Sequence, residues 1–174
     1  KIHVSGGVAS PADPLESVQY TTEEIRIIVT EAQHRGTYVS AHAYTSEAIA
    51  MAVDAGVHCI EHGNLMDDRT AALIADAGAV VVPTLVTYQA MDDIGRQLGP
   101  PEANLAKNSV VLDSGLESLE RTHRAGVTLG FGTDQGKLGN INGMAILAEC
   151  LGQTIPETGT TTFRPAYTPV TFGA

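Results

Sequence analysis

Residues 22–43 read TEEIRIIVTEAQHRGTYVSAHA, a helical pattern that ends at a glycine and leads directly into a short β-rich run. Its apolar residues follow the i, i+3, i+4, i+7 spacing of one helix face: Ile25, Ile28, Val29 and Ala32. Thr21 and Glu24 have the spacing of a capping box. Gly36 stands where helices commonly end in a left-handed residue. The stretch therefore predicts one helix followed by one strand over residues 37–43.

The same unit of helix, glycine and strand recurs three more times. Helices are predicted over residues 46–55, 69–77 and about 101–125, each ending at a glycine, and strands over 57–62, 79–86 and 127–134. A further strand, residues 2–5, precedes the first helix. Strands that alternate with helices are typical of a parallel sheet. Five strands fit either an open doubly wound sheet or part of a (β/α)8 barrel, and periodicity does not decide between them.

Two stretches lack this rhythm. Residues 6–20 are rich in Gly, Pro and Ser and are predicted to form a long loop after the first strand. Residues 153–174 are rich in Thr, Pro and Gly and are predicted to form an irregular tail. A chain of 174 residues is short enough for one domain, which we place at residues 1–152.

Composition narrows the range of partners. The formal net charge is −10, which argues against nucleic-acid binding. No apolar run approaches the roughly 18 residues of a membrane span, so no membrane partner is expected. Cys59 and Cys150 are too few for a disulfide framework, and Cys59 is expected to be a small buried residue. A cytoplasmic location is favoured.

Polar residues cluster at the ends of the predicted strands. His42 and His62 lie near the ends of two consecutive strands, and Asp134 closes the last one. Functional sites of parallel α/β folds are built at the carboxyl ends of strands. Imidazoles and a carboxylate that meet there are suitable ligands for zinc or a similar divalent ion. The alternative is that each is a hydrogen-bonded structural residue.

The other histidines are assigned structural roles. His34 and His123 lie near the carboxyl ends of helices, where the helix dipole favours positive charge. His58 begins a strand and so belongs to the opposite end of the sheet. His3 shares a strand face with Lys1 and could line the site, but a packing role is favoured for it.

Taken together, five motifs resemble the amidohydrolase superfamily, and they cover the chain from Lys1 to about Glu149. The motifs are KIHVSGGVAS at residues 1–10, AHAYT at 41–45, IEHGN at 60–64, VPTLVT at 82–87 and GTD at 132–134. The resemblance is to prolidase-like Xaa-Pro dipeptidases and imidazolonepropionase-related hydrolases. It implies a TIM barrel, of which this chain would supply roughly strands 4 to 8 with their helices.

The resemblance also implies roles for particular residues. Lys1 would be a carboxylated lysine that bridges two metal ions, and His42, His62 and Asp134 would complete the ligands. Asp134 would also be the catalytic base for the attacking water. One or two divalent ions, zinc by preference, are implied as cofactor. Tyr44 would contact the substrate. Tyr88 is a weaker candidate for the pocket lining, and packing with its hydroxyl in water is preferred for it.

Three functions remain open at this stage. The first is hydrolysis of amide bonds in dipeptide-like substrates by a metal-activated water. The second is hydrolysis of cyclic amides, as in imidazolonepropionase. The third is an inactive fragment or a binding module, because the His-x-His pair of the family's first strand has no counterpart in this sequence. The expected partner is a small molecule or dipeptide, and the full-length protein could form a homo-oligomer.

Overall fold

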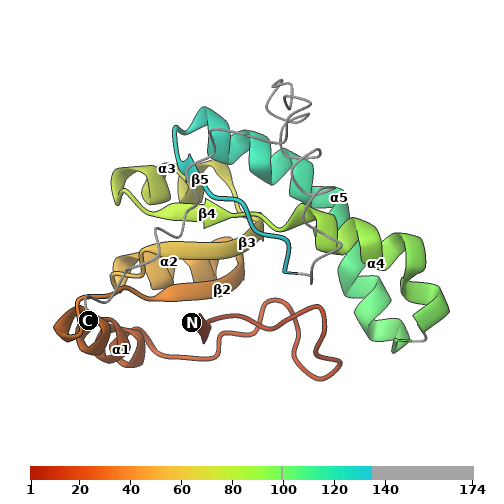
Figure 1. The fold of residues 1–174 in the computed structure, drawn as a ribbon, viewed down its shortest axis with the longest axis horizontal. Coiled ribbons are helices and arrows are strands. Elements are labelled where there is room, and N and C mark those ends of the chain that lie inside the picture. The colour runs from red at the N-terminus through yellow and green to blue at the C-terminus, as the bar shows by residue number, and fades with distance from the viewer. Residues whose placement is uncertain (99, 135–174) are drawn as a thin grey trace, which may run out of the picture.

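One parallel sheet of five strands runs through the protein, whose computed structural model describes residues 1–98 and 100–134, with the backbone alone for residues 94–98 (Figure 1). The strands are β1 (Ile2–His3), β2 (Ser40–Thr45), β3 (Cys59–Leu65), β4 (Val80–Val82) and β5 (Thr128–Leu129). Their order in the sheet is their order in the chain, and every neighbouring pair is parallel. A doubly wound sheet reverses its strand order part-way across. The uninterrupted order therefore indicates a segment of a barrel, as predicted.

The predicted repeat of helix, glycine and strand is confirmed. The helices are α1 (Thr22–His34), α2 (Ser46–Asp54), α3 (Asp68–Asp76), α4 (Leu85–Leu98) and α5 (Glu102–Arg124). Four of them are followed by a glycine with positive φ: Gly36, Gly56, Gly78 and Gly126. Thr21 and Glu24 form the expected capping box on α1. None of the described helices is both long and apolar enough to span a membrane.

Alternation along the strands separates a helix-facing side of the sheet from a polar side. Ala41 and Ala43 of β2 are fully buried in the main core, and Ile60 of β3, which pairs with Ala41, joins them there. The helices contribute their apolar faces to the same core: Ile25 and Val29 from α1, Ala48, Ile49 and Ala52 from α2, Ala71 and Ile74 from α3. His42 lies between the two alanines and so faces the opposite side. The apolar core therefore holds the strands in position, and the strands place polar side chains such as His42 on the side of the sheet away from the helices.

The predicted strand over residues 79–86 is too long. Pairing in β4 ends at Val82, and α4 begins at Leu85. Pro83 has no backbone N–H for a further ladder bond, and Thr84 has a φ of 49°, which turns the chain away from the sheet. A continuous apolar run does not by itself distinguish a strand from a buried helix, which is why the sequence pattern missed this boundary. As a result, α4 starts directly beside the carboxyl end of the sheet and forms a hairpin with α5 (Figure 1).

The predicted strand over residues 127–134 is likewise shorter than expected. It pairs with β4 only through Thr128 and Leu129, and the N–H of Gly130 then donates to the carbonyl of Val81 at 2.8 Å. Beyond this point the chain leaves the ladder and carries Asp134 past the end of β4. The predicted tail at residues 153–174, and its boundary at residue 152, lie outside the described residues.

The loop over residues 6–20 contains no helix or named strand, as predicted. Lys107 of α5 holds it in place. The Lys107 ammonium donates hydrogen bonds to three loop carbonyls, those of Gly7 (3.3 Å), Ser10 (2.6 Å) and Asp13. A side chain nearly a hundred residues away in the sequence therefore fixes the shape of this loop.

Candidate active site

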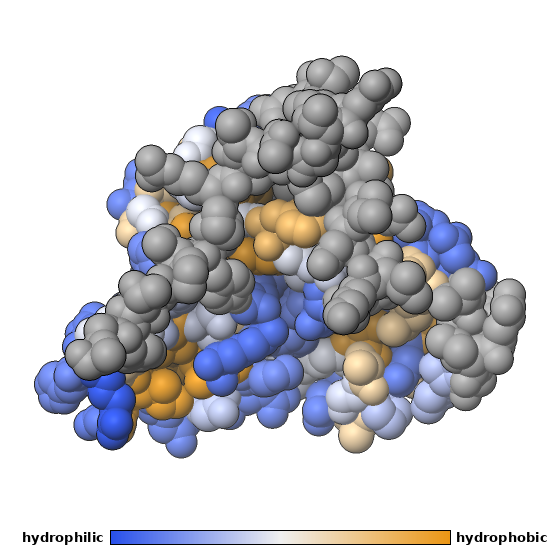
Figure 2. Space-filling view, in the orientation of Figure 1, coloured by the Kyte–Doolittle hydropathy of each residue, from blue (hydrophilic) through white to orange (hydrophobic). Residues whose placement is uncertain are grey.

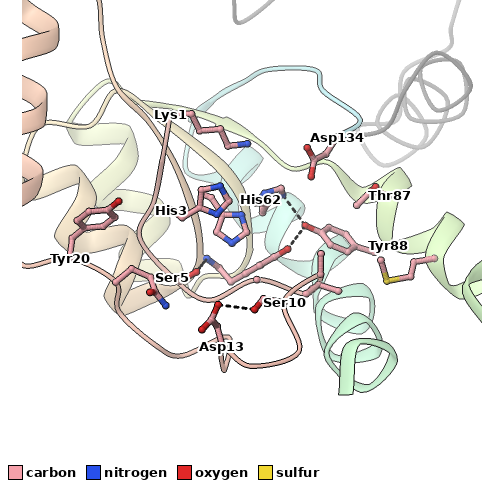
Figure 3. A pocket seen from close by; sticks show the side chains of 17 residues that line it. Lys1, His3, Ser5, Ser10, Asp13, Tyr20, His62, Thr87, Tyr88 and Asp134 are labelled. Carbon is pink, nitrogen blue, oxygen red and sulfur yellow. Dashed lines mark hydrogen bonds between the residues drawn. The ribbon is translucent and has the colours of Figure 1, made fainter. Parts of the chain in front are cut away.

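A cavity of about 890 Å³ lies at the carboxyl end of the sheet (Figure 3). Its walls come from β1, the loop over residues 6–20, β2, β3 and α4. The four residues predicted as metal ligands all line it: Lys1, His42, His62 and Asp134. Tyr44 and Tyr88 line it as well. On the face of the molecule shown in Figure 2, hydrophilic residues gather near the centre, with hydrophobic residues on either side.

The two predicted histidine ligands lie against each other in the cavity wall. The ring centroids of His42 and His62 are 4.6 Å apart, in an edge-to-face arrangement. His62 pairs with Ala43 in the sheet, so strict alternation would turn it towards the helices. Its φ of 79° takes it out of that alternation, and its ring lies against His42 instead. The local backbone of β3 thus brings two imidazoles from adjacent strands to one place.

Both imidazoles are held in their neutral form. Burial lowers the pKa of His42, and a hydrogen bond between its Nε2 and the Gly6 carbonyl (3.1 Å) only partly offsets this. Burial also lowers the pKa of His62 to well below its usual value, with a further lowering from His42. Neutral imidazole is the form that binds metal ions. The pair is therefore in the correct charge state for ligation at neutral pH.

Behind His62, Tyr88 is buried rather than in contact with water. Its hydroxyl lies 2.8 Å from His62 Nδ1 and 2.8 Å from the Tyr44 hydroxyl. Thr84 Oγ1 also lies 2.6 Å from His62 Nδ1. The predicted packing role with a wetted hydroxyl is therefore wrong for Tyr88, because α4, a helix that the sequence pattern did not predict, brings its first turn over the cavity. Burial raises the pKa of Tyr44 to about 12, so this phenol stays protonated.

Glu61 is a further charged residue at the site, and the sequence pattern did not single it out. It lies beside His42 in the sheet register and forms an ion pair with Lys1, whose Nζ is 2.5 Å from Glu61 Oε2. Ser40 Oγ donates a hydrogen bond to its other oxygen at 3.0 Å. A carboxylate within a short predicted strand was the available signal, since charged side chains are seldom buried unless they are paired.

His3 contributes a third imidazole to this wall. Its ring stacks on His42 with centroids 4.7 Å apart, and it lines the cavity as an exposed residue. The packing role favoured for His3 accounts for the stacking but not for this exposure. His58, in contrast, is exposed and contacts Tyr38 away from the cavity lining. His34 and His123 lie in the last turns of α1 and α5, as predicted.

Unusual backbone conformations concentrate at this end of the sheet. Among the described residues, three that are not glycine have positive φ: His62 (79°), Thr84 (49°) and Asp134 (50°). His62 lies within β3, whereas Thr84 follows β4 and Asp134 follows β5. Such conformations cost about 1–3 kcal/mol each and cluster at functional sites, where surrounding contacts maintain them. The three together indicate that this end of the sheet is built for a task other than stability.

Comparison with known proteins identifies the family to which this site belongs. The sequence profile of the amidohydrolase family matches residues 1–169. The chain belongs to the amidohydrolase family. A prolidase in complex with N-methylphosphonate-L-proline superimposes with a TM-score of 0.83 at 51% identity, over 87% of this chain and 38% of the prolidase chain. A Xaa-Pro dipeptidase with methionine in its active site superimposes with a TM-score of 0.77 at 31% identity, over 85% of this chain and 37% of the dipeptidase chain.

A further relative is found by sequence similarity. Ochratoxinase from Aspergillus niger is 31% identical to this chain over 134 residues, which cover 77% of this chain and 28% of the enzyme. This amidohydrolase chain thus spans between 28% and 38% of the length of the relatives named here. The superimpositions confirm that its five strands correspond to part of a barrel.

Amidohydrolases generally depend on metal ions, and the residues at the cavity fit such an ion by donor type. Two neutral imidazoles face one another, and a carboxylate, Asp134, lines the same space. Within residues 1–98 and 100–134, however, no three His, Cys, Asp or Glu side chains are arranged closely enough to hold a metal ion together. The ammonium of Lys1 is paired with the Glu61 carboxylate, and an ammonium has no lone pair with which to bind a metal ion. The described donor set is therefore partial, with the two histidines at its centre.

Proposed function

We propose that this chain is part of a metal-dependent amidohydrolase that cleaves C–N amide bonds in small, dipeptide-like substrates. The observation that carries the proposal is the pair of neutral imidazoles, His42 and His62, in the wall of a cavity that Asp134 also lines. The similarity to a prolidase and a Xaa-Pro dipeptidase supports a dipeptide as the substrate. The similarity to ochratoxinase supports amide hydrolysis more broadly.

The proposed roles follow from the chemistry of each side chain. His42 and His62 would hold a divalent ion, by preference zinc, which when bound lowers the pKa of water and polarises a carbonyl. Asp134 would accept the proton of the attacking water and pass it to the leaving nitrogen as the C–N bond breaks. Tyr44, protonated and lining the cavity, would donate a hydrogen bond to the substrate carboxylate or to the developing oxyanion.

Lys1 takes part in this proposal only in a modified form. Carboxylation of its amine would convert a cation into an anionic ligand, and that anion would face the Glu61 carboxylate. The ion pair between Lys1 and Glu61 would then have to open. The free-amine form, paired with Glu61, leaves His42, His62 and Asp134 as the proposed ligands.

For the polypeptide by itself we propose no activity. It spans at most 38% of the relatives named above, and in the described residues no three His, Cys, Asp or Glu side chains are arranged to hold a metal ion. The proposed activity therefore belongs to the complete protein. Cyclic amides stay an alternative substrate class, because the same residues would serve them and the cavity does not favour them over dipeptides.

The test compares substitutions in the complete enzyme. Asp134→Asn keeps an oxygen that can bind metal but loses the proton acceptor, so we expect turnover to fall about 10²–10⁴-fold while most of the metal is retained. His42→Ala and His62→Ala delete ligands and should remove metal and activity together. Metal content is measured by elemental analysis beside turnover of dipeptides and cyclic amides. His34→Ala, on the far end of α1, is the control and should change neither. Near-normal turnover of the Asp134→Asn enzyme would rule out the proposed base.

A further inference from the structure

A buried line of hydrogen-bonding groups runs from His62 to Tyr44 through Tyr88. The Tyr88 hydroxyl lies 2.8 Å from both His62 Nδ1 and the Tyr44 hydroxyl, as the dashed lines in Figure 3 show. Thr84 Oγ1 lies 2.6 Å from the same Nδ1 and 3.4 Å from the Tyr88 hydroxyl. All four residues are at most 3% exposed. Buried polar groups of this kind fix one another, because an unmade hydrogen bond is costly there.

The protons available allow two directions for this line. A neutral imidazole carries one N–H, and each hydroxyl has one proton. In the first arrangement, His62 Nδ1–H donates to Tyr88 and the Tyr88 hydroxyl donates to Tyr44. In the second, Tyr44 donates to Tyr88 and Tyr88 donates to Nδ1. The second arrangement places the imidazole proton on Nε2 and uses the Tyr44 proton inside the protein.

The surroundings of His62 favour the first arrangement. Within the described residues, Nε2 of His62 has no hydrogen-bond acceptor. His62 lines the cavity, so an N–H at Nε2 would have no acceptor there among the described protein groups, whereas Nδ1 has oxygen atoms at 2.6 and 2.8 Å. Placing the proton on Nδ1 gives it two acceptors, Thr84 Oγ1 and the Tyr88 hydroxyl. Burial keeps both tyrosines protonated, since it raises the pKa of each.

We propose that Tyr88 is a positioning residue that sets the direction of this line. Its oxygen accepts the Nδ1–H of His62, and its own proton is donated to the Tyr44 oxygen. Two consequences follow at the cavity. His62 keeps the lone pair of Nε2 for a ligand, and Tyr44 keeps its proton free to donate to a substrate oxygen. One hydroxyl thus prepares both a metal-binding atom and a substrate-binding atom.

This inference rests on the proposed function for what the free lone pair and the free proton are used for. The direction of the hydrogen bonds does not rest on it. The direction is a property of the chain alone and is measurable without metal or substrate. Failure of the proposed activity and failure of this inference are therefore distinguishable.

The first measurement is ¹⁵N NMR of the histidine side chains in the full chain, kept in chelator. We expect the His62 spectrum to show the tautomer protonated at Nδ1. A spectrum with His62 protonated at Nε2 would overturn the proposal. This measurement needs no substitution, so it does not depend on a variant that folds.

The second measurement repeats the spectrum with Tyr88→Phe, which removes the hydroxyl and keeps the ring. Only Thr84 then remains beside Nδ1, and we expect a mixture of both tautomers. Tyr38→Phe is the matched control, because Tyr38 contacts a different histidine, His58, away from the cavity lining. It should leave the His62 spectrum unchanged. An unchanged tautomer in the Tyr88→Phe chain would show that Thr84 alone sets it and would overturn the role of Tyr88.

The third measurement connects the tautomer to its use. In the complete enzyme, loss of a hydrogen bond that orients a ligating histidine should weaken zinc binding about 10–100-fold. We expect this for Tyr88→Phe and not for Tyr38→Phe, measured by competition with a chromophoric chelator. Equal zinc affinities for the wild type and Tyr88→Phe would overturn the positioning role, whatever the enzyme turns over.

Discussion

At the scale of single residues, the two buried histidines make the folded state sensitive to acid. Burial lowers the pKa values of His42 and His62 below the 6.5 of a free imidazole. Below about pH 6.5 the unfolded chain therefore binds protons that the folded chain does not. The stability that these residues contribute is complete above pH 6.5 and is lost as the pH falls towards the folded-state values.

This difference predicts a pH-dependent free energy of unfolding in the metal-free chain. Between pH 7.5 and 5.5 we expect it to fall, with a slope of up to about 1.4 kcal/mol per pH unit for each histidine. Urea unfolding in the presence of chelator measures it. His62→Gln should reduce the slope, whereas His123→Gln, on the exposed end of α5, should leave it as in the wild type. If His62→Gln leaves the slope unchanged, the pH dependence does not come from the lowered pKa of His62.

Two adjacent glycines offer a matched test of the loop beside His42. A Cβ at Gly6 would overlap the carbonyl oxygen of Pro14, whereas a Cβ at Gly7 would make an ordinary contact of 3.7 Å with the His42 ring. We expect Gly6→Ala to destabilise the chain by about 1–3 kcal/mol, the usual cost of forced overlap. Gly7→Ala should cost well under that. Thermal unfolding of the two variants side by side measures the difference, and equal losses would show that the loop yields at Gly6.

The sequence predicts some of these residues and not others, for physical reasons. His42, His62 and Asp134 were singled out as polar residues near predicted strand ends, although His42 and His62 lie inside β2 and β3 and Asp134 lies beyond β5. The positive φ of His62 was not predictable, since residues other than glycine seldom adopt it. Glu61 was missed and Tyr88 was assigned to packing, because their importance lies in partners distant in the sequence, Lys1 for Glu61 and His62 for Tyr88.

At the scale of elements, helix boundaries were predicted well where a glycine or a helix cap marks them. The boundary between strand and helix was predicted wrongly in the continuous apolar run at residues 79–86. The boundaries of α1, α2, α3 and α5 agree with the predicted helices to within a residue or two. At residues 83–86 an apolar run suits strand and helix equally, and a proline together with a left-handed threonine decided the outcome. Helix α4 was therefore unpredicted, and the cavity wall that it forms was unpredicted with it.

The stability of the loop over residues 6–20 is predicted to depend on its contact with Lys107 of α5. Lys107→Met removes the ammonium that three loop carbonyls share, so we expect a loss of about 2 kcal/mol, as for hydrogen bonds to a charged group. We also expect faster amide hydrogen exchange in the loop than in α2. Ser109→Ala, exposed on the same helix, is the control. Unchanged exchange in the Lys107→Met loop would mean that the loop holds its shape without α5.

At the scale of the whole molecule, the sheet ends in two edges. Among the described residues, no strand pairs with the outer side of β1 or of β5. Unpaired backbone groups on an edge invite association with another chain. We therefore expect the isolated chain to self-associate as its concentration rises, measured by sedimentation velocity.

A charge placed on one edge should reduce this association. Thr128 of β5 is exposed, so Thr128→Lys adds an edge charge of the kind that blocks strand pairing, without loss of core contacts. His123→Lys, on the exposed last turn of α5, adds a similar charge away from the edge and should have no effect. If Thr128→Lys sediments as the wild type does, association does not proceed through β5.

A sheet whose strand order is the chain order can also be built in the direction of synthesis. Each strand from β2 to β5 has its first neighbour already made when it leaves the ribosome, so no strand has to wait for a later one. Contacts between successive units are close in sequence, which favours rapid formation. The cavity, however, draws on the first residue described and on the last. In a nascent chain the two histidines come together before Asp134 is made, so the order of translation also sets the order in which the cavity wall is completed.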